Sequence, residues 1–509
     1  MIPDAHGAAP RLDALLERAA RTRPEREAVV FRGRSSTYAE VHERACRLAG
    51  ALAARGVGKG DRVAFWATNR PEFVEFIFGV PKLGAIAAPL DHWWGFAEAI
   101  EAIGQVRPRT IIAAGPQAAA LAAHRDRIGA AGVHHVLCLD EPAAGAPFEP
   151  YAPALAAAAA GIAPTPVAPG DPAAIFFTSG STGRSKGAVH THGSLDAAAT
   201  IMNLELGLED GERTLHFLPL FSSCMEHLIP LTLARATHVI LPSFDAAGAW
   251  AAVEAHAVTH FDAVPTTLRR LLEAAPAEIP ASLRMISYAS ELMPPAVLAA
   301  LAGRMPRVAL VQFYGMIEQL CLTVLDAADH LRKAATVGRP MIGAEIRILE
   351  DESHEILARS PTLFAGYWED EAATARVMHE GWLRTGDSGR FDADGFLVLD
   401  GRLKDMIKTG GVTVIPAEIE SVLMGHPDVS DAAVVGVPDD QWGEAVHAFV
   451  TLASGASARE TELQSFCRER LAGYKRPKAI HVVPELPRTG IGKIARRVVR
   501  QNILAAGRN

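Results

Sequence analysis

The chain has 509 residues, of which 49% are hydrophobic and 6% aromatic, and its formal net charge is −8. This length exceeds what one compact core usually holds, so we expect two or more domains. The acidic balance and the lack of a long basic run argue against a nucleic-acid-binding surface.

The cysteines and the apolar stretches of the chain indicate the cellular compartment. The five cysteines are scattered and form no Cys-x-x-Cys pair, which argues against a disulfide framework and a zinc site. The first residues lack the apolar centre of a signal peptide, and no apolar stretch has the length of a membrane span. The sequence therefore predicts a cytoplasmic protein with reduced thiols and no membrane span.

Helices and apolar strands alternate from the first residues to about Val311. The spacing of apolar residues predicts helices over Arg11–Arg21 and Tyr38–Arg55, and a strand over Arg62–Trp66. This alternation is typical of an α/β layer fold with largely parallel sheets.

The pattern changes after about Gly338. Short strand-like runs such as Glu345–Leu349 indicate an antiparallel, β-rich segment. Beyond it, a helix is predicted over Pro416–Met424, and Ser457 with Glu460 forms the pattern of a capping box that opens another helix. We predict a large N-terminal domain of layered α/β subdomains plus this β-rich segment, residues 1–403, and a small C-terminal α/β domain, residues 404–509.

A loop rich in glycine and hydroxyl groups follows the apolar run that begins at Ile175. Glycine lets the backbone fold around an anion, while hydroxyls, backbone N–H groups and a lysine supply donors and charge. The loop is not a Walker P-loop, because Ser185 precedes its lysine and Gly187 follows it. The sequence predicts a phosphate site formed by Thr178, Ser179, Gly180, Ser181, Thr182, Gly183 and Lys186.

Four more motifs follow the loop in the chain. They are Tyr314-Gly315-Met316-Ile317-Glu318, Thr385-Gly386-Asp387, the stretch from Arg402 to Gly411, and Thr489-Gly490-Ile491-Gly492-Lys493. In this order the five motifs resemble those of the adenylate-forming superfamily, which includes acyl- and aryl-CoA synthetases, luciferases and peptide-synthetase adenylation domains. The resemblance covers nearly the whole chain.

The resemblance implies an ATP site. Tyr314, with Gly315, would lie against adenine, Glu318 would hold Mg²⁺, and Asp387 would accept both ribose hydroxyls. Ile317 stands where the family has threonine, which removes a hydroxyl near the α-phosphate. Ser290 and Glu291 align with the family's glycine-rich adenine loop, but this chain has no glycine there.

The C-terminal motifs imply a mobile small domain. Lys493 would bridge the substrate carboxylate and the α-phosphate, and Arg402 would contact the ribose or a phosphate as a fixed cation. Lys404 would be the hinge about which the small domain turns. Gly410 and Gly411 would line the tunnel for the pantetheine arm of CoA.

Residues after His216 resemble the segment that lines the family's acyl pocket. Phe221, Ser222 and Cys224 would belong to that pocket, with Ser222 where many CoA ligases have histidine. Small side chains there leave room for a larger acyl group, and they equally fit ordinary helix packing. No positive side chain falls clearly in the predicted pocket, so a dicarboxylate substrate is not favoured.

The resemblance implies an AMP-forming acid–thiol ligase that uses ATP, Mg²⁺ and CoA. Lys493, Glu318 and Lys186 are its predicted catalytic residues, and its other substrate is a small carboxylic acid. A carrier protein or another nucleophile remains an alternative acceptor, and a nucleotide-binding relative without catalysis is the alternative outside enzymes. We expect a monomer or a homodimer.

Overall fold

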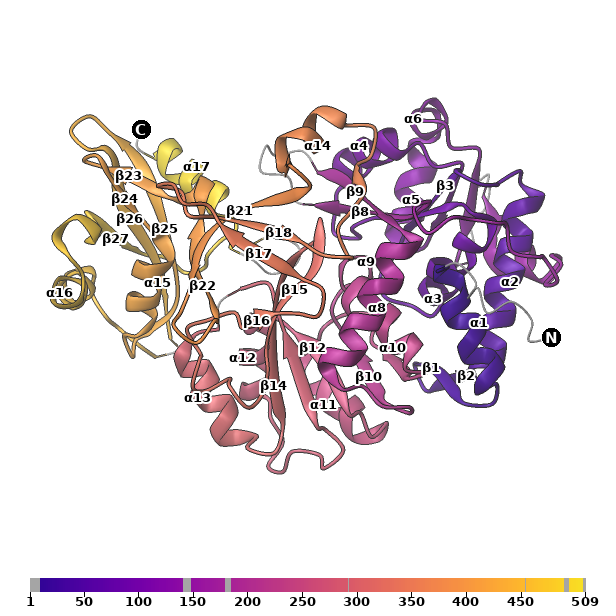
Figure 1. Cartoon of the computed structure of the whole chain (residues 1–509), viewed down its shortest axis with the longest axis horizontal. Helices are drawn as coiled ribbons and strands as arrows, with labels where there is room; N and C mark the ends of the chain where they lie inside the picture. Colours follow the sequence, from indigo (N-terminus) through magenta and orange to yellow (C-terminus); the bar gives the residue numbers. More distant parts are fainter. Residues whose placement is uncertain are drawn as a thin grey trace.

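The computed structural model describes residues 10–140, 148–178, 185–291, 293–453, 455–488 and 494–506. Two large mixed sheets and their helices form the body of the molecule, a small antiparallel sheet follows, and a separate α/β domain lies at one end (Figure 1). The mixed α/β architecture with a large N-terminal and a small C-terminal domain is therefore confirmed.

The first large sheet is parallel at its centre and antiparallel at both edges. Its central strands β11, β10, β12, β13 and β14 run parallel, whereas β2 pairs antiparallel with β1, and β15 and β16 add antiparallel strands at the other edge. In spatial order the strands are β16 (Arg339–Pro340), β15 (Gln319–Leu325), β14 (Ala309–Met316), β13 (Met285–Tyr288), β12 (His260–Ala263), β10 (Arg213–His216), β11 (Thr237–Ile240), β1 (Glu27–Phe31) and β2 (Arg34–Thr37).

The second large sheet is also parallel except at one edge, where β8, β9 and β19 are antiparallel. In spatial order its strands are β19 (Gly366–Tyr367), β9 (Lys186–Thr191), β8 (Pro172–Thr178), β4 (Ile86–Pro89), β3 (Arg62–Trp66), β5 (Thr110–Ala113), β6 (His135–Cys138) and β7 (Glu149–Pro150).

Helices cover both faces of each large sheet. Strand β3 shows why its sequence is continuously apolar: Val63 and Phe65 join one buried cluster, while Ala64 and Trp66 join another on the opposite face. The larger cluster takes residues from both sheets, and it also takes residues from α1 (Leu12–Thr22), α2 (Tyr38–Ala54), α3 (Glu72–Gly79), α7 (Tyr151–Ala156), α8 (His192–Leu206), α9 (Leu220–Ser223), the π-helical turn η2 (Cys224–Leu228) and α10 (Ile229–Leu233).

The outer faces of the two sheets carry their own helices. Cores under them contain Trp250 and Phe261 on the first sheet, and Trp66 and Ile103 on the second. These helices are α11 (Ala246–Ala255), α12 (Pro265–Glu273) and α13 (Pro295–Arg304) on the first sheet, and α4 (Phe96–Val106), α5 (Gly115–Ala123) and α6 (Arg125–Ala130) on the second; η1 (Pro81–Leu83) follows α3.

A smaller antiparallel sheet lies between the body and the C-terminal domain (Figure 1). Its strands are β17 (Glu345–Ile348), β18 (Glu355–Arg359), β21 (Trp382–Phe391), β20 (Met378–His379) and β22 (Leu397–Arg402), and α14 (Glu371–Val377) leads into β20. The predicted domain boundary between residues 403 and 404 falls in the short helix η3 (Leu403–Asp405) that follows β22.

The C-terminal domain is a sheet with helices on both faces. Along β25, Ala432 and Val434 face one core with α15 and α16, while Ala433 and Val435 face a second core with α17. Its elements are β23 (Ile407–Thr409), β24 (Val412–Val414), α15 (Pro416–Met424), β25 (Val429–Asp439), β26 (Gly443–Leu452), α16 (Glu460–Arg470), η4 (Gly473–Lys475), β27 (Ala479–Val482) and α17 (Arg496–Ala506).

The predicted elements are found with small shifts at their ends, and α15 and β3 match to the residue. The predicted capping box is wrong. The helix begins at Glu460, and Glu462 accepts a hydrogen bond from the backbone N–H of Arg459, so Ser457 lies outside the cap. No helix in the described part of the chain combines the length and hydrophobicity needed to cross a membrane.

Candidate active site

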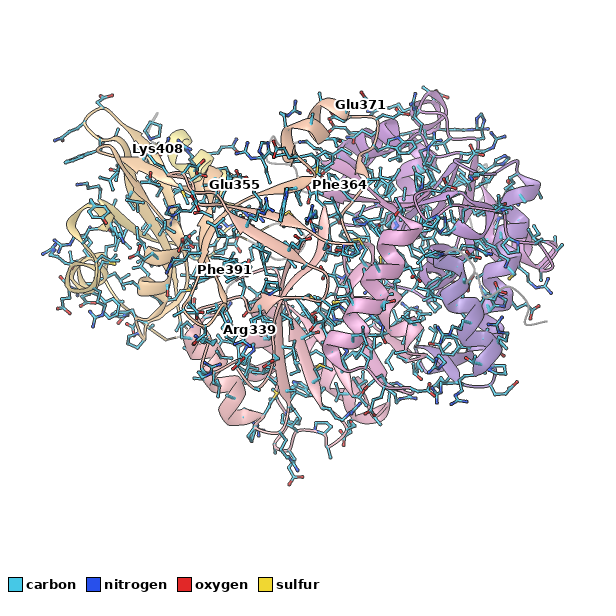
Figure 2. All side chains as sticks on the ribbon, viewed as in Figure 1. Arg339, Glu355, Phe364, Glu371, Phe391 and Lys408 are labelled. Atoms are coloured by element: carbon cyan, nitrogen blue, oxygen red, sulfur yellow. The ribbon has the colours of Figure 1, made fainter. Side chains whose placement is uncertain are left out.

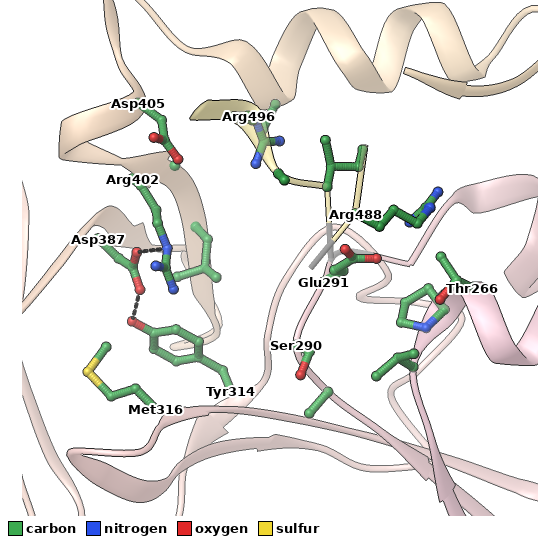
Figure 3. A pocket seen from close by; sticks show the side chains of 18 of the residues that line it. Thr266, Ser290, Glu291, Tyr314, Met316, Asp387, Arg402, Asp405, Arg488 and Arg496 are labelled. Atoms are coloured by element: carbon green, nitrogen blue, oxygen red, sulfur yellow. Dashed lines mark hydrogen bonds and ion pairs between the residues drawn. The ribbon is translucent and has the colours of Figure 1, made fainter. Parts of the chain in front are cut away.

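A cleft of about 2210 Å³ lies between the large body and the C-terminal domain. One wall is formed where β12, β13 and β14 end, which is where ligands bind in open α/β sheets. The opposite wall comes from β25, α15 and α17 of the small domain. Figure 3 shows side chains from both walls directed toward the same space.

Tyr314, Asp387 and Arg402 form one connected group in the cleft (Figure 3). The Tyr314 hydroxyl donates to Oδ2 of Asp387 at 2.8 Å, and Nε of Arg402 lies 3.3 Å from Oδ1. Burial and the adjacent Asp387 carboxylate raise the pKa of Tyr314, so its hydroxyl remains a donor. Three motifs that are far apart in the sequence therefore meet here.

A buried glutamate supports the turn that carries Asp387. Glu355, which is 3% exposed, accepts from Nε of Arg384 at 2.9 Å and from the backbone N–H of Gly386 at 3.1 Å. Gly386 has a φ of 72°, a left-handed conformation that glycine adopts without steric cost. The sequence gives no signal for Glu355, because the pairing of β18 with β21 alone brings it to this turn.

Glu318 and Lys186 meet through a tyrosine that the motifs do not include. The Tyr367 hydroxyl donates to Oε1 of Glu318 at 2.6 Å, and Nζ of Lys186 lies 4.9 Å from the centre of the Tyr367 ring. Tyr367 reaches this position because β19 pairs antiparallel with β9, the strand that begins at Lys186. Burial, followed by the charge of Glu318, raises the pKa of Tyr367.

One described side chain at the cleft, that of Glu318, has the chemistry of a magnesium ligand. Glu318 presents a carboxylate at the cleft, and Tyr367 contacts both this carboxylate and the lysine of the phosphate loop. Mg²⁺ is commonly held by one or two carboxylates together with the phosphates of a nucleotide, so one glutamate here is a reasonable protein ligand.

The phosphate loop connects two antiparallel strands. Thr178 ends β8 and lies opposite Lys186, the first residue of β9, and both line the cleft. Residues 179–184, which include the predicted donors Ser179, Gly180, Ser181, Thr182 and Gly183, lie outside the described residues. A strand rather than a helix follows the loop, which agrees with the rejection of a Walker P-loop.

Ser290 and Glu291 line the cleft just after β13, where the family has glycine. Ser290 has a φ of 82°, which a residue with a side chain rarely adopts. The backbone at this point therefore has the shape that favours glycine, although the residue is serine. Gly315, at the end of β14, also lines the cleft.

The residues on either side of the C-terminal lysine loop line the cleft. Lys493 itself lies outside the described residues, as do Thr489, Gly490 and Gly492. Arg488 and Ile494, on either side of that segment, pair as a short antiparallel bridge, and both line the cleft. Arg488 also forms an ion pair with Asp431.

A second arginine beside this loop is held in place by a buried carboxylate. Nη2 of Arg496 lies 2.6 Å from Oε2 of Glu420, which is 5% exposed, and both residues line the cleft. Figure 3 shows Arg496 and Arg488 on the small-domain side and Glu291 on the opposite side. On this face of the small domain, Arg488 and Arg496 at the cleft are therefore both paired with carboxylates of the same domain.

Gly410 and Gly411 lie elsewhere. They form the two-residue turn between β23 and β24, with φ values of 58° and 79°, and neither lines the cleft. The positive φ values by themselves account for two glycines, as in tight hairpin turns of this length. Figure 2 shows the neighbouring Lys408 on the small domain, and Lys408 does not line the cleft. Lys404 lines the cleft within η3, between the two domains.

Only two of the three predicted acyl-pocket residues line the cleft. Phe221 and Ser222 line the cleft, whereas Cys224 is fully buried in the main core, where burial raises the pKa of its thiol. The turn from α9 into η2 points Cys224 inward and leaves Met225 and Glu226 on the cleft. Sequence reasoning missed Glu226, because its exposure depends on that turn.

The chain is similar to known proteins over nearly its whole length. The AMP-binding enzyme family matches residues 16–368, and the AMP-binding enzyme C-terminal domain matches residues 418–493. A feruloyl-CoA synthase of Amycolatopsis sp. is 36% identical over 95% of this chain and 97% of that protein. An indoleacetate–CoA ligase of Aromatoleum aromaticum is 34% identical over 96% of this chain and 98% of its own length.

Solved structures show the same fold over nearly the whole chain. ATP-bound MatB of Rhodopseudomonas palustris superposes with a TM-score of 0.88 at 27% identity, covering 97% of this chain and 99% of MatB. An anthranilate CoA ligase in complex with anthranoyl-AMP gives a TM-score of 0.90 at 27% identity, with 98% of each chain covered. The chain therefore belongs to the family of AMP-binding enzymes.

Proposed function

We propose that this protein is an AMP-forming acid–CoA ligase, which activates a carboxylic acid with ATP and transfers the acyl group to the thiol of CoA. The observation that carries the proposal is the convergence of Tyr314, Asp387, Arg402 and Glu318 with both ends of the phosphate loop in one interdomain cleft. The relatives named above are CoA ligases, which supports the same reaction.

In the first half-reaction, a carboxylate oxygen of the acid forms a bond to the α-phosphorus of ATP. The bond from that phosphorus to the bridging oxygen of the β-phosphate breaks, and pyrophosphate leaves. Lys186 and the loop from Thr178 would hold the departing phosphates. Lys493 would lie between the two anions that must meet, so it lowers their repulsion. Mg²⁺ bound at Glu318 would neutralise part of the phosphate charge.

The nucleotide would be oriented by the group around Asp387. The carboxylate suits the two ribose hydroxyls, and the hydrogen bond from Tyr314 and the ion pair with Arg402 fix its position. The ring of Tyr314 would lie against adenine, beside Ser290, Glu291 and Gly315.

In the second half-reaction, the thiol sulfur of CoA forms a bond to the acyl carbonyl carbon and loses its proton to solvent. The bond between that carbon and the phosphate oxygen breaks, and AMP leaves. We propose that the small domain turns about Lys404 between the halves, so that Gly410 and Gly411 reach the cleft. The present arrangement supports the first half-reaction, because the residues that flank Lys493 line the cleft and the glycine turn does not.

We also propose that the enzyme works in the cytoplasm.

The first test removes the bridging lysine. Lys493→Ala should abolish acid-dependent exchange of labelled pyrophosphate into ATP, while Lys408→Ala, a lysine on the same domain that does not line the cleft, should leave the exchange intact. Exchange at the normal rate in Lys493→Ala would remove this lysine from the first half-reaction.

The second test addresses the hinge and the acceptor. Lys404→Pro should keep pyrophosphate exchange and lose thioester formation, because proline restricts the backbone at the turning point. Mass spectrometry of products formed with CoA or with a carrier protein identifies the acceptor. Loss of both half-reactions together in Lys404→Pro would contradict the hinge.

A further inference from the structure

Two carboxyl groups and a buried histidine lie together just after the predicted acyl-pocket residues of α9. Glu226 is on η2, directly after the acyl-pocket residues of α9, and Asp262 is near the end of β12; both line the cleft. His227 is 2% exposed and packs behind them. Candidate ligand atoms of Glu226, His227 and Asp262 all lie within 4.8 Å of one another. We call these three residues the acidic floor.

The hydrogen bonds beneath the floor restrict what it can bind. Ser287 Oγ lies 2.9 Å from Nε2 of His227, 2.9 Å from Nε2 of His260 and 3.3 Å from Oδ1 of Asp262. The Ser287 hydroxyl has a single proton. When it donates this proton to Asp262, His227 and His260 must each donate from Nε2 to the hydroxyl oxygen. The proton-free Nδ1 of His227 is then an acceptor, 3.5 Å from Oδ2 of Asp262.

The three residues of the acidic floor place several hydrogen-bond acceptors close together. Nδ1 of His227 is buried and has no hydrogen-bond partner within the described residues, a state that usually costs about 1–3 kcal/mol. Burial, followed by the charge of Glu226, raises the pKa of Asp262, and burial lowers the pKa of His227. Glu226 and Asp262 line the cleft, so a ligand group that brings hydrogen-bond donors there would contact their carboxyl groups and offset the proximity of the two.

The neighbouring wall is apolar. Phe221 and Trp93 line the cleft with their ring centres 6.1 Å apart and their planes at 88°, and Met225 lines it beside Glu226. A flat or aliphatic apolar group fits such a wall, while the floor fits a donor at its end. The same three floor residues have the ligand types of a divalent cation site, but their position next to the predicted acyl-pocket residues favours an organic donor.

We propose that the acid activated by this enzyme carries an amine or hydroxyl group on an apolar body, and that this group binds at Glu226 and Asp262. The inference rests on the proposed function, since it concerns the acyl pocket of the same reaction. It assigns Glu226 and Asp262 as residues that determine specificity.

The test compares acids that differ only in the donor. Benzoate, cinnamate and hexanoate are each paired with amino and hydroxyl derivatives, substituted at positions 3 and 4 of the rings and at the end of the hexanoate chain. Pyrophosphate release gives kcat/KM for each acid. We expect the best substituted acid to exceed its unsubstituted parent by about 100-fold, because a site that hydrogen-bonds a donor of its substrate rejects the analogue that lacks this donor.

Variants then locate the preference. Glu226→Gln and Asp262→Asn should each lower the ratio of substituted to parent kcat/KM at least tenfold, whereas Glu273→Gln, an exposed glutamate elsewhere on the cleft, should keep the ratio. Amine and hydroxyl derivatives separate a cationic from a neutral donor. Metal analysis of the purified wild-type protein accompanies the kinetics.

Three results would overturn the inference. They are equal kcat/KM for substituted and parent acids in the wild type, a preference that survives both floor variants, and one equivalent of bound metal that both variants lose. The first result leaves the proposed function standing, because the parent acids react. Absence of pyrophosphate release with every acid of a broad panel would overturn both proposals together.

Discussion

Ser290 combines a functional position with an unfavourable backbone angle. Its φ of 82° places a residue with a Cβ in a region that glycine occupies freely, at a cost of order 1–3 kcal/mol. It lies on the cleft wall where the resemblance places adenine. The strain therefore belongs to the site and not to a distant surface turn.

Ser290→Gly should raise the free energy of unfolding by about 1 kcal/mol, because glycine adopts this φ without the Cβ penalty. Urea unfolding followed by circular dichroism measures the change. Ser290→Ala is the matched control, since it removes the hydroxyl and keeps the Cβ. An equal gain in the alanine variant would show that the hydroxyl, and not the backbone angle, is the source.

At the scale of the elements, the backbone of the turn between β23 and β24 explains why both of its residues are glycine. Both residues of the turn have positive φ. A Cβ on Gly410 would lie 3.0 Å from Cε3 of Trp442, whereas a Cβ on Gly411 would meet no atom within 4 Å. The two glycines thus differ in their surroundings although their backbones are similar.

Gly410→Ala should destabilise the small domain by about 1–2 kcal/mol, and Gly411→Ala by about 1 kcal/mol, because only the first also crowds Trp442. Urea unfolding of both variants tests the order. If the turn reaches the cleft in the second half-reaction, both should slow thioester formation and leave pyrophosphate exchange unchanged. A larger loss of stability in Gly411→Ala would contradict the assigned contact.

At the scale of the molecule, one hydrogen bond from the large body to the small domain bears on how the two domains are arranged. Nη1 of Arg269, on α12 of the large body, donates to the backbone carbonyl of Ser430 on β25 at 2.9 Å. A rotation of the small domain would break this hydrogen bond. It therefore favours the arrangement in which Arg488 and Ile494, the residues that flank Lys493, line the cleft.

Arg269→Ala should slow the first half-reaction about tenfold and affect the second less, since a hydrogen bond from a charged group contributes about 1.5–3 kcal/mol. Arg270→Ala is the control, because Arg270 stacks over Phe244 within the large body, 4.7 Å from the ring centre. Single-turnover measurements of acyl-adenylate and thioester formation separate the halves. Equal slowing of both half-reactions in Arg269→Ala would argue against a role in the domain arrangement.

Buried histidines set the acid limit of stability for the whole molecule. Burial lowers the pKa of His190 and of His260 to about 4, and that of His238 to about 3. These folded-state pKa values lie below the ordinary value of 6.5, so the unfolded chain binds more protons between about pH 4 and 6.5. Stability is full above pH 6.5 and falls as the pH drops through this window.

Lowering the pH from 7.5 to 5.5 should reduce the free energy of unfolding by about 1 kcal/mol for each such histidine. Urea unfolding at the two pH values gives the difference. A variant of the exposed His379, such as His379→Asn, should show the same pH dependence as the wild type. Stability that is flat across this range would show that these histidines keep ordinary pKa values when folded.

The sequence by itself determined the order of the elements, the α/β class and the motifs that carry the nucleotide chemistry. Local spacing is enough for these, because apolar periodicity and glycine-rich loops are read over a few residues. It identified Tyr314, Asp387 and Arg402 separately, and the resemblance joined them.

Only the tertiary structure decided which side chains support and complete the site. Glu355 reaches the turn of Asp387 through strand pairing, and Tyr367 reaches Glu318 because β19 adds to the edge of a sheet. Cys224 and Glu226 are two residues apart, yet Cys224 is buried and Glu226 lines the cleft. There Glu226 lies close to Asp262, which belongs to a strand distant in the sequence. Such contacts depend on topology and on the turn of a helix, which short-range patterns do not encode.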